Sequence, residues 1–135
     1  MTSEIIYIGE LRTEATHRNS GNLIRTDAPP DNQGKGEAFS PTDLAATSLG
    51  CCMLTVMGIK ARDNKIDMDG TKISIKKVMA ANPRRISEIH VEIKMPRIKY
   101  SDNEKQLLID TAINCPVALS LHPDIRQVVN FDFEE

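Results

Sequence analysis

Two neighbouring cysteines, Cys51 and Cys52, lie within the apolar, uncharged stretch ATSLGCCMLTVMGI, and a third, Cys115, lies in INCPVALSLH. The three cannot all pair with one another, and a small secreted scaffold usually carries an even and denser set. The chain has no C-x-x-C pair and only three histidines, so the ligand spacing of a structural zinc site is missing. We therefore expect free thiols in a reducing compartment and no metal.

Free thiols on two separate helices suit a redox reaction in which one cysteine is oxidised and a second resolves it. On a helix Cys51 and Cys52 point about 100° apart, and a disulfide between neighbours would need strained geometry, so the two should have different roles. Cys115 precedes Pro116, and as the N-cap of a short helix it would lie where free N–H groups favour a thiolate. The structural alternative is that each cysteine is a small buried hydrophobe.

The cysteine pair lies on a predicted helix from Pro41 to about Arg62. Ser40 can cap its start, and the Asn-, Asp- and Gly-rich segment after Arg62 can end it. One apolar stripe at helical spacing consists of Ala45, Leu49, Cys52, Val56 and Ile59. Other faces of this helix are apolar as well, which predicts a central helix covered nearly all round.

Strands and a second helix complete the predicted α+β fold. The β-leaning segments are, in chain order, IIYIGELRTEATH, GNLIRTD, GTKISIKKVMA, RRISEIHVEIKMP and RQVVNFDFEE. The third and fourth form a predicted hairpin, because apolar and polar residues alternate along them. Ser101 and Glu104 form a capping box that opens the second helix, and Pro116 ends it.

Length and charge exclude several classes of protein. The 135 residues suit a single domain, 1–135, and the net charge of −2 gives no basic field for a nucleic-acid partner. The longest uncharged stretch, Leu44 to Ile59, is shorter than the run of about 20 apolar residues that a bilayer requires. The N-terminal residues show no basic segment followed by a long apolar one, so no secretory signal is visible. We expect a cytoplasmic protein with no membrane partner.

The stretch FSPTDLAATSLGCCMLTVMG, followed later by INCPVALSLH, resembles the OsmC/Ohr family of thiol-dependent hydroperoxide reductases. The resemblance covers nearly the whole chain, because the long loop, the cysteine-bearing helix, the hairpin and the C-P-V motif occur in the family's order. It implies an OsmC/Ohr-like fold with antiparallel sheets around long buried central helices. It also implies an interlocked homodimer, with a pair of active sites at the subunit boundary.

The resemblance assigns Cys52 to the peroxidatic position and Cys115 to the resolving position. It implies an enzyme without a cofactor that reduces organic hydroperoxides to alcohols. A Cys52 sulfenic acid forms and condenses with Cys115, and an external dithiol then reduces the disulfide. A dihydrolipoyl protein or another small thiol system is the implied reductant.

The chain departs from the family at the start of the cysteine-bearing helix. Organic hydroperoxide reductases of this family resemble N-P-E-Q-L there, with the Glu positioning an Arg beside the thiolate, whereas this chain has SPTDL with Thr42 in the Glu position. Glu37 is the candidate substitute, and Asp43 is better explained as a charge at the helix start. Arg18 is the nearest match for the family Arg, with Arg12 and Arg25 as the other candidates.

A second function remains open because of this departure, which indicates a less-studied OsmC-like branch. The same apolar helix and missing Glu also fit a non-catalytic dimeric domain that binds a small apolar ligand or senses thiol oxidation. Loss of peroxide above a dithiothreitol background would distinguish the enzyme from this alternative.

Overall fold

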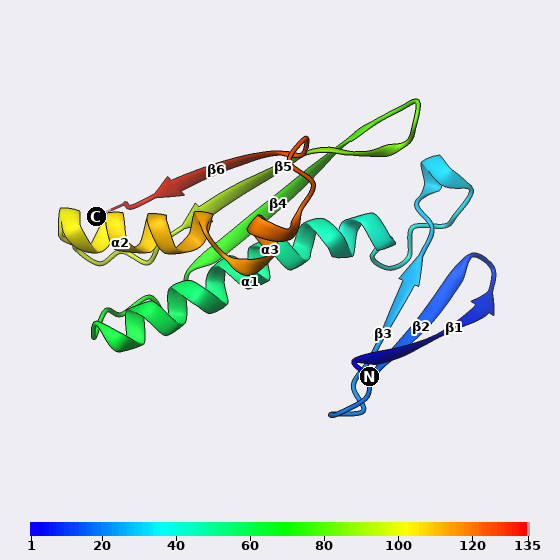
Figure 1. The fold of residues 1–135 in the computed structure, drawn as a ribbon, viewed down its shortest axis with the longest axis horizontal. Helices are drawn as coiled ribbons and strands as arrows, with labels where there is room; N and C mark the ends of the chain where they lie inside the picture. Colours follow the sequence, from blue (N-terminus) through cyan, green and yellow to red (C-terminus); the bar gives the residue numbers. More distant parts are fainter. Residues whose placement is uncertain (135) are drawn as a thin grey trace. The chain divides into compact units, whose positions relative to one another are not determined.

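The structure is a computed structural model that describes residues 1–134, and these residues form two compact units. The first unit is Met1–Ala45, and the second begins at Ala46. Figure 1 shows the element order along the chain.

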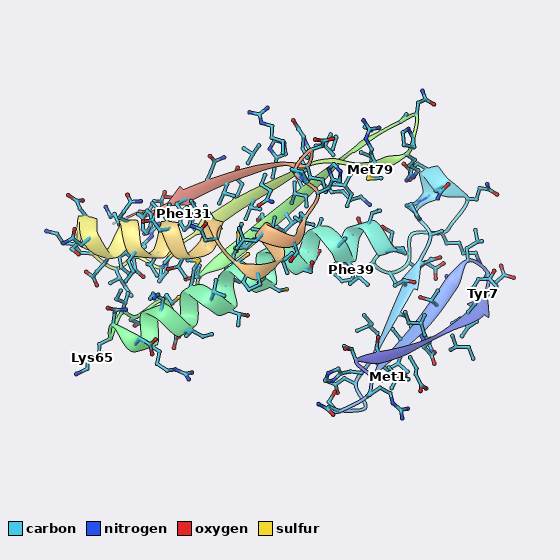
Figure 2. The ribbon with its side chains drawn as sticks, in the orientation of Figure 1. Met1, Tyr7, Phe39, Lys65, Met79 and Phe131 are labelled. Carbon is cyan, nitrogen blue, oxygen red and sulfur yellow. The ribbon has the colours of Figure 1, made fainter. Side chains whose placement is uncertain are left out.

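The first unit is built on a three-stranded antiparallel sheet of β1 (Ser3–Gly9), β2 (Arg12–His17) and β3 (Leu23–Asp27). These strands confirm the two β-leaning segments expected before the long loop, which itself holds the short 3₁₀ helix Pro30–Asn32. Large apolar side chains of this unit lie exposed, among them Tyr7 and Phe39 in Figure 2; the others are Met1, Ile5, Ile6, Ile8, Leu11, Leu23 and Ile24. Since none of the core side chains comes from residues 1–45, this sheet lacks a core of its own in one chain.

Helix α1 (Pro41–Asp63) carries the cysteine pair, and its bounds confirm the predicted start and lie one residue beyond the predicted end. Ser40 caps it as expected: the Asp43 N–H donates to Ser40 Oγ at 3.0 Å, and the Ser40 N–H donates to Asp43 Oδ2 at 3.0 Å. Asp43 therefore serves the helix start, as its position predicted. By length and composition alone α1 could cross a membrane, but the core helix of a soluble protein passes the same test.

The buried face of α1 overlaps only in part with the apolar stripe found in the sequence. Leu49 is buried, but Ile59 is exposed, and Ala45, Cys52 and Val56 are only partly buried. The buried residues of α1 are Ala46, Leu49, Gly50, Met53, Met57 and Ala61. When a helix has apolar residues on all sides, the periodicity of its sequence does not by itself select the buried face.

The second unit contains a mixed sheet in the order β4-β5-β6, covered by helices. Its elements after α1 are β4 (Lys72–Ala80), β5 (Arg85–Lys94), α2 (Asp102–Ile113), α3 (Pro116–Ser120) and β6 (Arg126–Asp132). The β4–β5 hairpin is antiparallel as predicted, but β6 runs parallel to β5. The expectation of purely antiparallel sheets is therefore wrong, because α2 and α3 form the crossover that a parallel pair requires.

One face of this sheet forms the core with the helices. Ile89, Val91 and Ile93 alternate along β5 and are fully buried, as their spacing predicted, and they join α1 and α2 residues in one apolar cluster. Helix α1 approaches the sheet closely at Gly50, where a Cβ would lie 3.1 Å from the side chains of Ile73 and Ile75.

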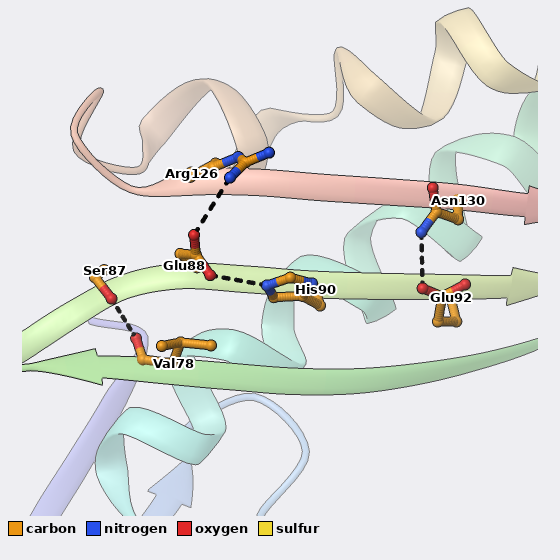
Figure 3. Close-up of polar contacts among 7 residues, drawn as sticks. All are labelled: Val78, Ser87, Glu88, His90, Glu92, Arg126 and Asn130. Atoms are coloured by element: carbon orange, nitrogen blue, oxygen red, sulfur yellow. Dashed lines mark hydrogen bonds and ion pairs between the residues drawn. The ribbon is translucent and has the colours of Figure 1, made fainter.

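The other face of the sheet is polar, as Figure 3 shows. Glu88 contacts His90 at 2.9 Å and Arg126 at 3.6 Å, and Asn130 donates to Glu92 at 2.8 Å. The Glu88–Arg126 and Glu92–Asn130 pairs link β5 to β6 on the side away from the core, and the Glu88–His90 pair lies within β5. The helices therefore cover a single face of the sheet, and the cysteines they carry lie on that side.

Candidate active site: a cysteine pair and an arginine cluster

Cys52 lies on the flank of α1, between the buried face and the solvent. Its side chain is partly buried and packs against the apolar core of the second unit. Cys51, the preceding residue, is exposed. The turn of about 100° between neighbouring helical residues thus separates the two thiols, as the sequence predicted.

Cys115 lies at the junction of α2 and α3, and it is almost fully buried, with 1% of its surface exposed. It is the N-cap of α3, with Pro116 in the first helical turn, and its Sγ accepts a hydrogen bond from the Ala118 N–H at 3.4 Å. The predicted capping role is confirmed. Proline favours this position because its missing N–H would have no partner in the first turn anyway.

The Cys52 and Cys115 side chains lie close enough to interact electrostatically, so α1 and the α2–α3 junction bring the two thiols near each other. Burial raises the pKa of the Cys115 thiol, the Cys52 side chain raises it further, and the Ala118 N–H opposes both effects. The expectation that the helix start favours a Cys115 thiolate is therefore wrong, because the loss of solvation outweighs the backbone hydrogen bond. The raised pKa favours the protonated form of the Cys115 thiol.

Alkylation at different pH values tests this protonation state. We expect iodoacetamide to modify exposed Cys51 quickly and buried Cys115 slowly, because the thiolate is the reacting species and must be accessible. The Cys115 rate should still be rising with pH above about 8.5, the ordinary value for a free thiol. The measurement is peptide mapping by mass spectrometry after timed quenching. A Cys115 rate that levels off below this value would contradict the raised pKa.

The first unit holds an arginine cluster centred on Arg12. The β2–β3 register places Arg12 directly opposite Asp27, and Arg12 Nη2 lies 3.4 Å from Asp27 Oδ2 and 2.9 Å from Glu37 Oε2. These contacts raise the pKa of Arg12, with the hydrogen bond that Arg12 donates to the Glu37 side chain as the largest cause. Arg12 is therefore a fixed positive charge between two carboxylates.

Asp27 joins the strand, the loop and Arg12. Its Oδ2 also accepts a hydrogen bond from the Glu37 N–H at 2.9 Å, and this bond is the largest cause of its lowered pKa, with Arg12 contributing as well. The Asp27 side chain is only 1% exposed, whereas that of Glu37 is 60% exposed. A cavity of about 160 Å³ is lined by Arg12, Arg25, Thr26, Asp27, Glu37 and Ala38.

The other predicted site residues have different neighbours. Arg18 forms an exposed ion pair with Glu4 at 3.4 Å, and Arg25 pairs with Glu14 at 2.9 Å. The structure thus joins Glu37 to Arg12, one of the other two arginines considered, and not to Arg18. Asp27 was not considered from the sequence, although the pairing of two short neighbouring strands could have placed it opposite Arg12.

Within residues 1–134, no three His, Cys, Asp or Glu side chains gather closely enough to hold a metal ion. Cys52 and Cys115 belong to the second unit, and the arginine cluster belongs to the first.

The family model described as OsmC-like protein matches residues 34–129, a range that includes the second half of the loop before α1, both Cys52 and Cys115, and most of β6. The chain belongs to the OsmC-like family. This confirms the resemblance drawn from the FSPTDL and INCPV stretches. No curated protein matches the sequence.

Solved structures support the OsmC-like assignment and its fold. A protein from Psychrobacter arcticus 273-4, provisionally named an osmotic stress induced and detoxification response protein, is 56% identical, with 98% of this chain and 96% of that chain covered and a TM-score of 0.94. The organic hydroperoxide resistance protein OsmC of Legionella pneumophila is 15% identical, with 98% and 97% covered and a TM-score of 0.76. The organic hydroperoxide resistance protein OhrB of Bacillus subtilis is 16% identical, with 98% of both chains covered and a TM-score of 0.72.

Proposed function

We propose that this OsmC-like protein is a thiol-dependent peroxidase that reduces organic hydroperoxides to alcohols. The observation that carries the proposal is the contact between the Cys52 and Cys115 thiols, which come from separate elements and differ in exposure. Two members of the same fold are named for organic hydroperoxide resistance, which supports the substrate class. We also propose a cytoplasmic location, because the cysteines are free thiols, and neither a nucleic-acid nor a membrane partner.

The first step uses Cys52 because its partly buried side chain is the more accessible of the pair. Its thiolate attacks the distal oxygen of the hydroperoxide, the O–O bond breaks, and the alkoxide takes up a proton and leaves as the alcohol. Cys52 is then a sulfenic acid. Cys115 does not compete for the peroxide, because it is buried and its pKa is raised.

The second step uses the contact between the two sulfur atoms. The Cys115 sulfur attacks the Cys52 sulfur, water leaves, and a Cys52–Cys115 disulfide forms. Two thiols that already lie close enough to interact need little movement to form this bond. An external dithiol, which a dihydrolipoyl protein would supply, then reduces the disulfide and is itself oxidised.

Arg12 is the arginine that we propose for stabilising the Cys52 thiolate. The family resemblance implies an arginine that an acidic side chain positions, and Arg12 is the candidate that contacts Glu37. Arg18 contacts Glu4 at the exposed end of the sheet. Glu37 is thus an acidic side chain that contacts this arginine, whereas Thr42 stands in the family Glu position at the start of α1.

We further propose an interlocked homodimer. The first unit has a sheet with exposed Ile5, Ile6, Tyr7 and Ile24, and few such side chains remain exposed on a soluble domain without a partner surface. Helix α1 also exposes apolar residues outside its buried face, including Ile59. A second copy of the chain would cover both surfaces.

Sedimentation tests the dimer. We expect a single species of twice the chain's 15.0 kDa at micromolar concentration, because the first unit has no apolar core to hold it folded alone. Unfolding by denaturant should have a midpoint that rises with protein concentration. A stable folded monomer, with a midpoint independent of concentration, would contradict the proposal.

Peroxide consumption tests the function itself. Reduced protein is incubated with cumene hydroperoxide and dithiothreitol, and the peroxide that remains is measured with time. We expect consumption above the dithiothreitol background. A rate equal to that background would instead favour the non-catalytic alternative, a dimeric domain that binds a small apolar ligand or senses oxidation.

A further inference from the structure

Arg12 is shared by two carboxylates that differ in burial and in how firmly they are held. Asp27 is buried beside it, with 1% of its side chain exposed, and Glu37 reaches it from the solvent side, with 60% exposed. A carboxylate in solvent is screened and moves easily, whereas a buried one keeps its place and its interaction. The two partners of Arg12 are therefore unequal.

Asp27 is held in position by the backbone on both sides. It ends strand β3, its N–H donates to the Phe39 carbonyl at 3.1 Å, and its Oδ2 accepts the Glu37 N–H at 2.9 Å. Strand pairing fixes its Cα opposite that of Arg12. The carboxylate is thus fixed relative to both the sheet and the loop before Arg12 binds it.

Two buried polar atoms in this cluster lack a partner among the described residues, namely Arg12 Nε and Asp27 Oδ1. One is a donor and the other an acceptor, and they belong to groups already joined through Nη2 and Oδ2 at 3.4 Å. Two parallel bonds between a guanidinium and a carboxylate use this arrangement of atoms. A small rotation of Arg12 toward Asp27 would therefore satisfy both atoms.

We propose that Asp27 is the positioning residue of Arg12 and that Glu37 is its displaceable partner. When Glu37 moves away, the Arg12 guanidinium binds both carboxylate oxygens of Asp27 and keeps its orientation. The inference rests on the proposed function, in which Arg12 serves the Cys52 thiolate. Asp27 acts through Arg12 and does not itself touch the reacting atoms.

The test compares Asp27→Asn with Glu37→Gln and with Glu14→Gln, the last being a matched control. Glu14 pairs with Arg25 across the same two strands. Its replacement therefore removes a negative charge from the same sheet but leaves both carboxylate partners of Arg12 in place. Two quantities are measured in each protein: the ¹⁵N–¹H signal of the Arg12 Nε–H without peroxide, and kcat and KM for cumene hydroperoxide. Thermal unfolding shows which variants fold.

We expect Asp27→Asn to shift or broaden the Arg12 signal and to lower kcat by about ten- to a hundredfold with little change in KM, as misdirected catalytic groups do. Glu37→Gln should have a smaller effect on both, and Glu14→Gln should match the wild type. An unchanged Arg12 signal and kcat in Asp27→Asn, or larger effects in Glu37→Gln, would overturn the proposal.

A second variant keeps the test decisive if Asp27→Asn does not fold. Asp27→Glu retains the charge but moves the carboxylate by one methylene, so it should displace the Arg12 signal and lower kcat. Wild-type values of both in Asp27→Glu would overturn the positioning role. If the wild type consumes no peroxide, the proposed function fails, and the Arg12 signal alone then decides whether Asp27 fixes Arg12.

Discussion

Replacing Cys52 with serine should abolish peroxide turnover. A serine hydroxyl does not ionise at neutral pH and does not form the sulfenic acid, so neither the attack on the O–O bond nor the later disulfide remains possible. Cys115 should not substitute for it, because that thiol is buried and its pKa is raised. The measurement is cumene hydroperoxide consumption with dithiothreitol as reductant, and we expect Cys52→Ser to fall to the dithiothreitol background.

Cys51→Ser is the matched control for this prediction. It makes the same chemical change one residue earlier on α1, at an exposed side chain that points about 100° away from Cys52. Most of the activity should remain. Equal losses of activity in the two variants would show that the reacting face of α1 is not the one that carries Cys52 alone.

Local signals in the sequence were enough to place most of the elements. Ser40 and Pro41 gave the start of α1, and the capping box of Ser101 and Glu104, which the structure forms in both directions, gave the start of α2. The alternation through Ile89 and Val91 gave both the strand and its buried face. These features depend on residues within a few positions of one another, and so they can be recognised without the rest of the fold.

Features that depend on distant residues were not predictable in the same way. The parallel pairing of β5 with β6 is set by the crossover through α2 and α3, and the alternation of a single strand does not specify its neighbour's direction. The buried face of α1 is set by close approach to Ile73 and Ile75 at Gly50. An apolar helix offers several faces for such a contact, so its own pattern could not select one.

The candidate site also combines features that local motifs predict with features that depend on distant residues. Two separated motifs identified Cys52 and Cys115, and the structure brings these thiols together. The raised pKa of Cys115 depends on burial by the second unit. The position of Cys115 at the start of a short helix had instead predicted that the thiolate is favoured. Asp27 was not identified from the sequence because its role depends on Arg12, which lies opposite it on β2. An acidic residue at the end of a strand is not distinctive by itself.

Cys115→Ser should convert the reaction from disulfide formation to sulfenic acid accumulation. In the wild type, one equivalent of hydroperoxide should remove two hydrogens and give a peptide that links Cys52 to Cys115, with Cys51 still alkylatable. The Cys115 thiol lies close enough to Cys52 to interact with it, which places the resolving sulfur within reach, and the exposed Cys51 lies on another face of α1. Without Cys115, Cys52 has no neighbour on which to condense, so a sulfenic acid trap such as dimedone should label it.

More hydroperoxide should then carry Cys52 of Cys115→Ser to the sulfinic acid, which a dithiol does not reduce, whereas the wild-type disulfide protects the sulfur from this step. Activity of the variant should therefore decline during turnover as the sulfinic form accumulates, and mass spectrometry can follow both quantities in one sample. The outcome that decides against the two-cysteine mechanism is oxygen added at Cys52 in the wild type while Cys115 remains alkylatable. In that case the contact between the thiols would be a packing contact, and an outside thiol would have to resolve Cys52 directly.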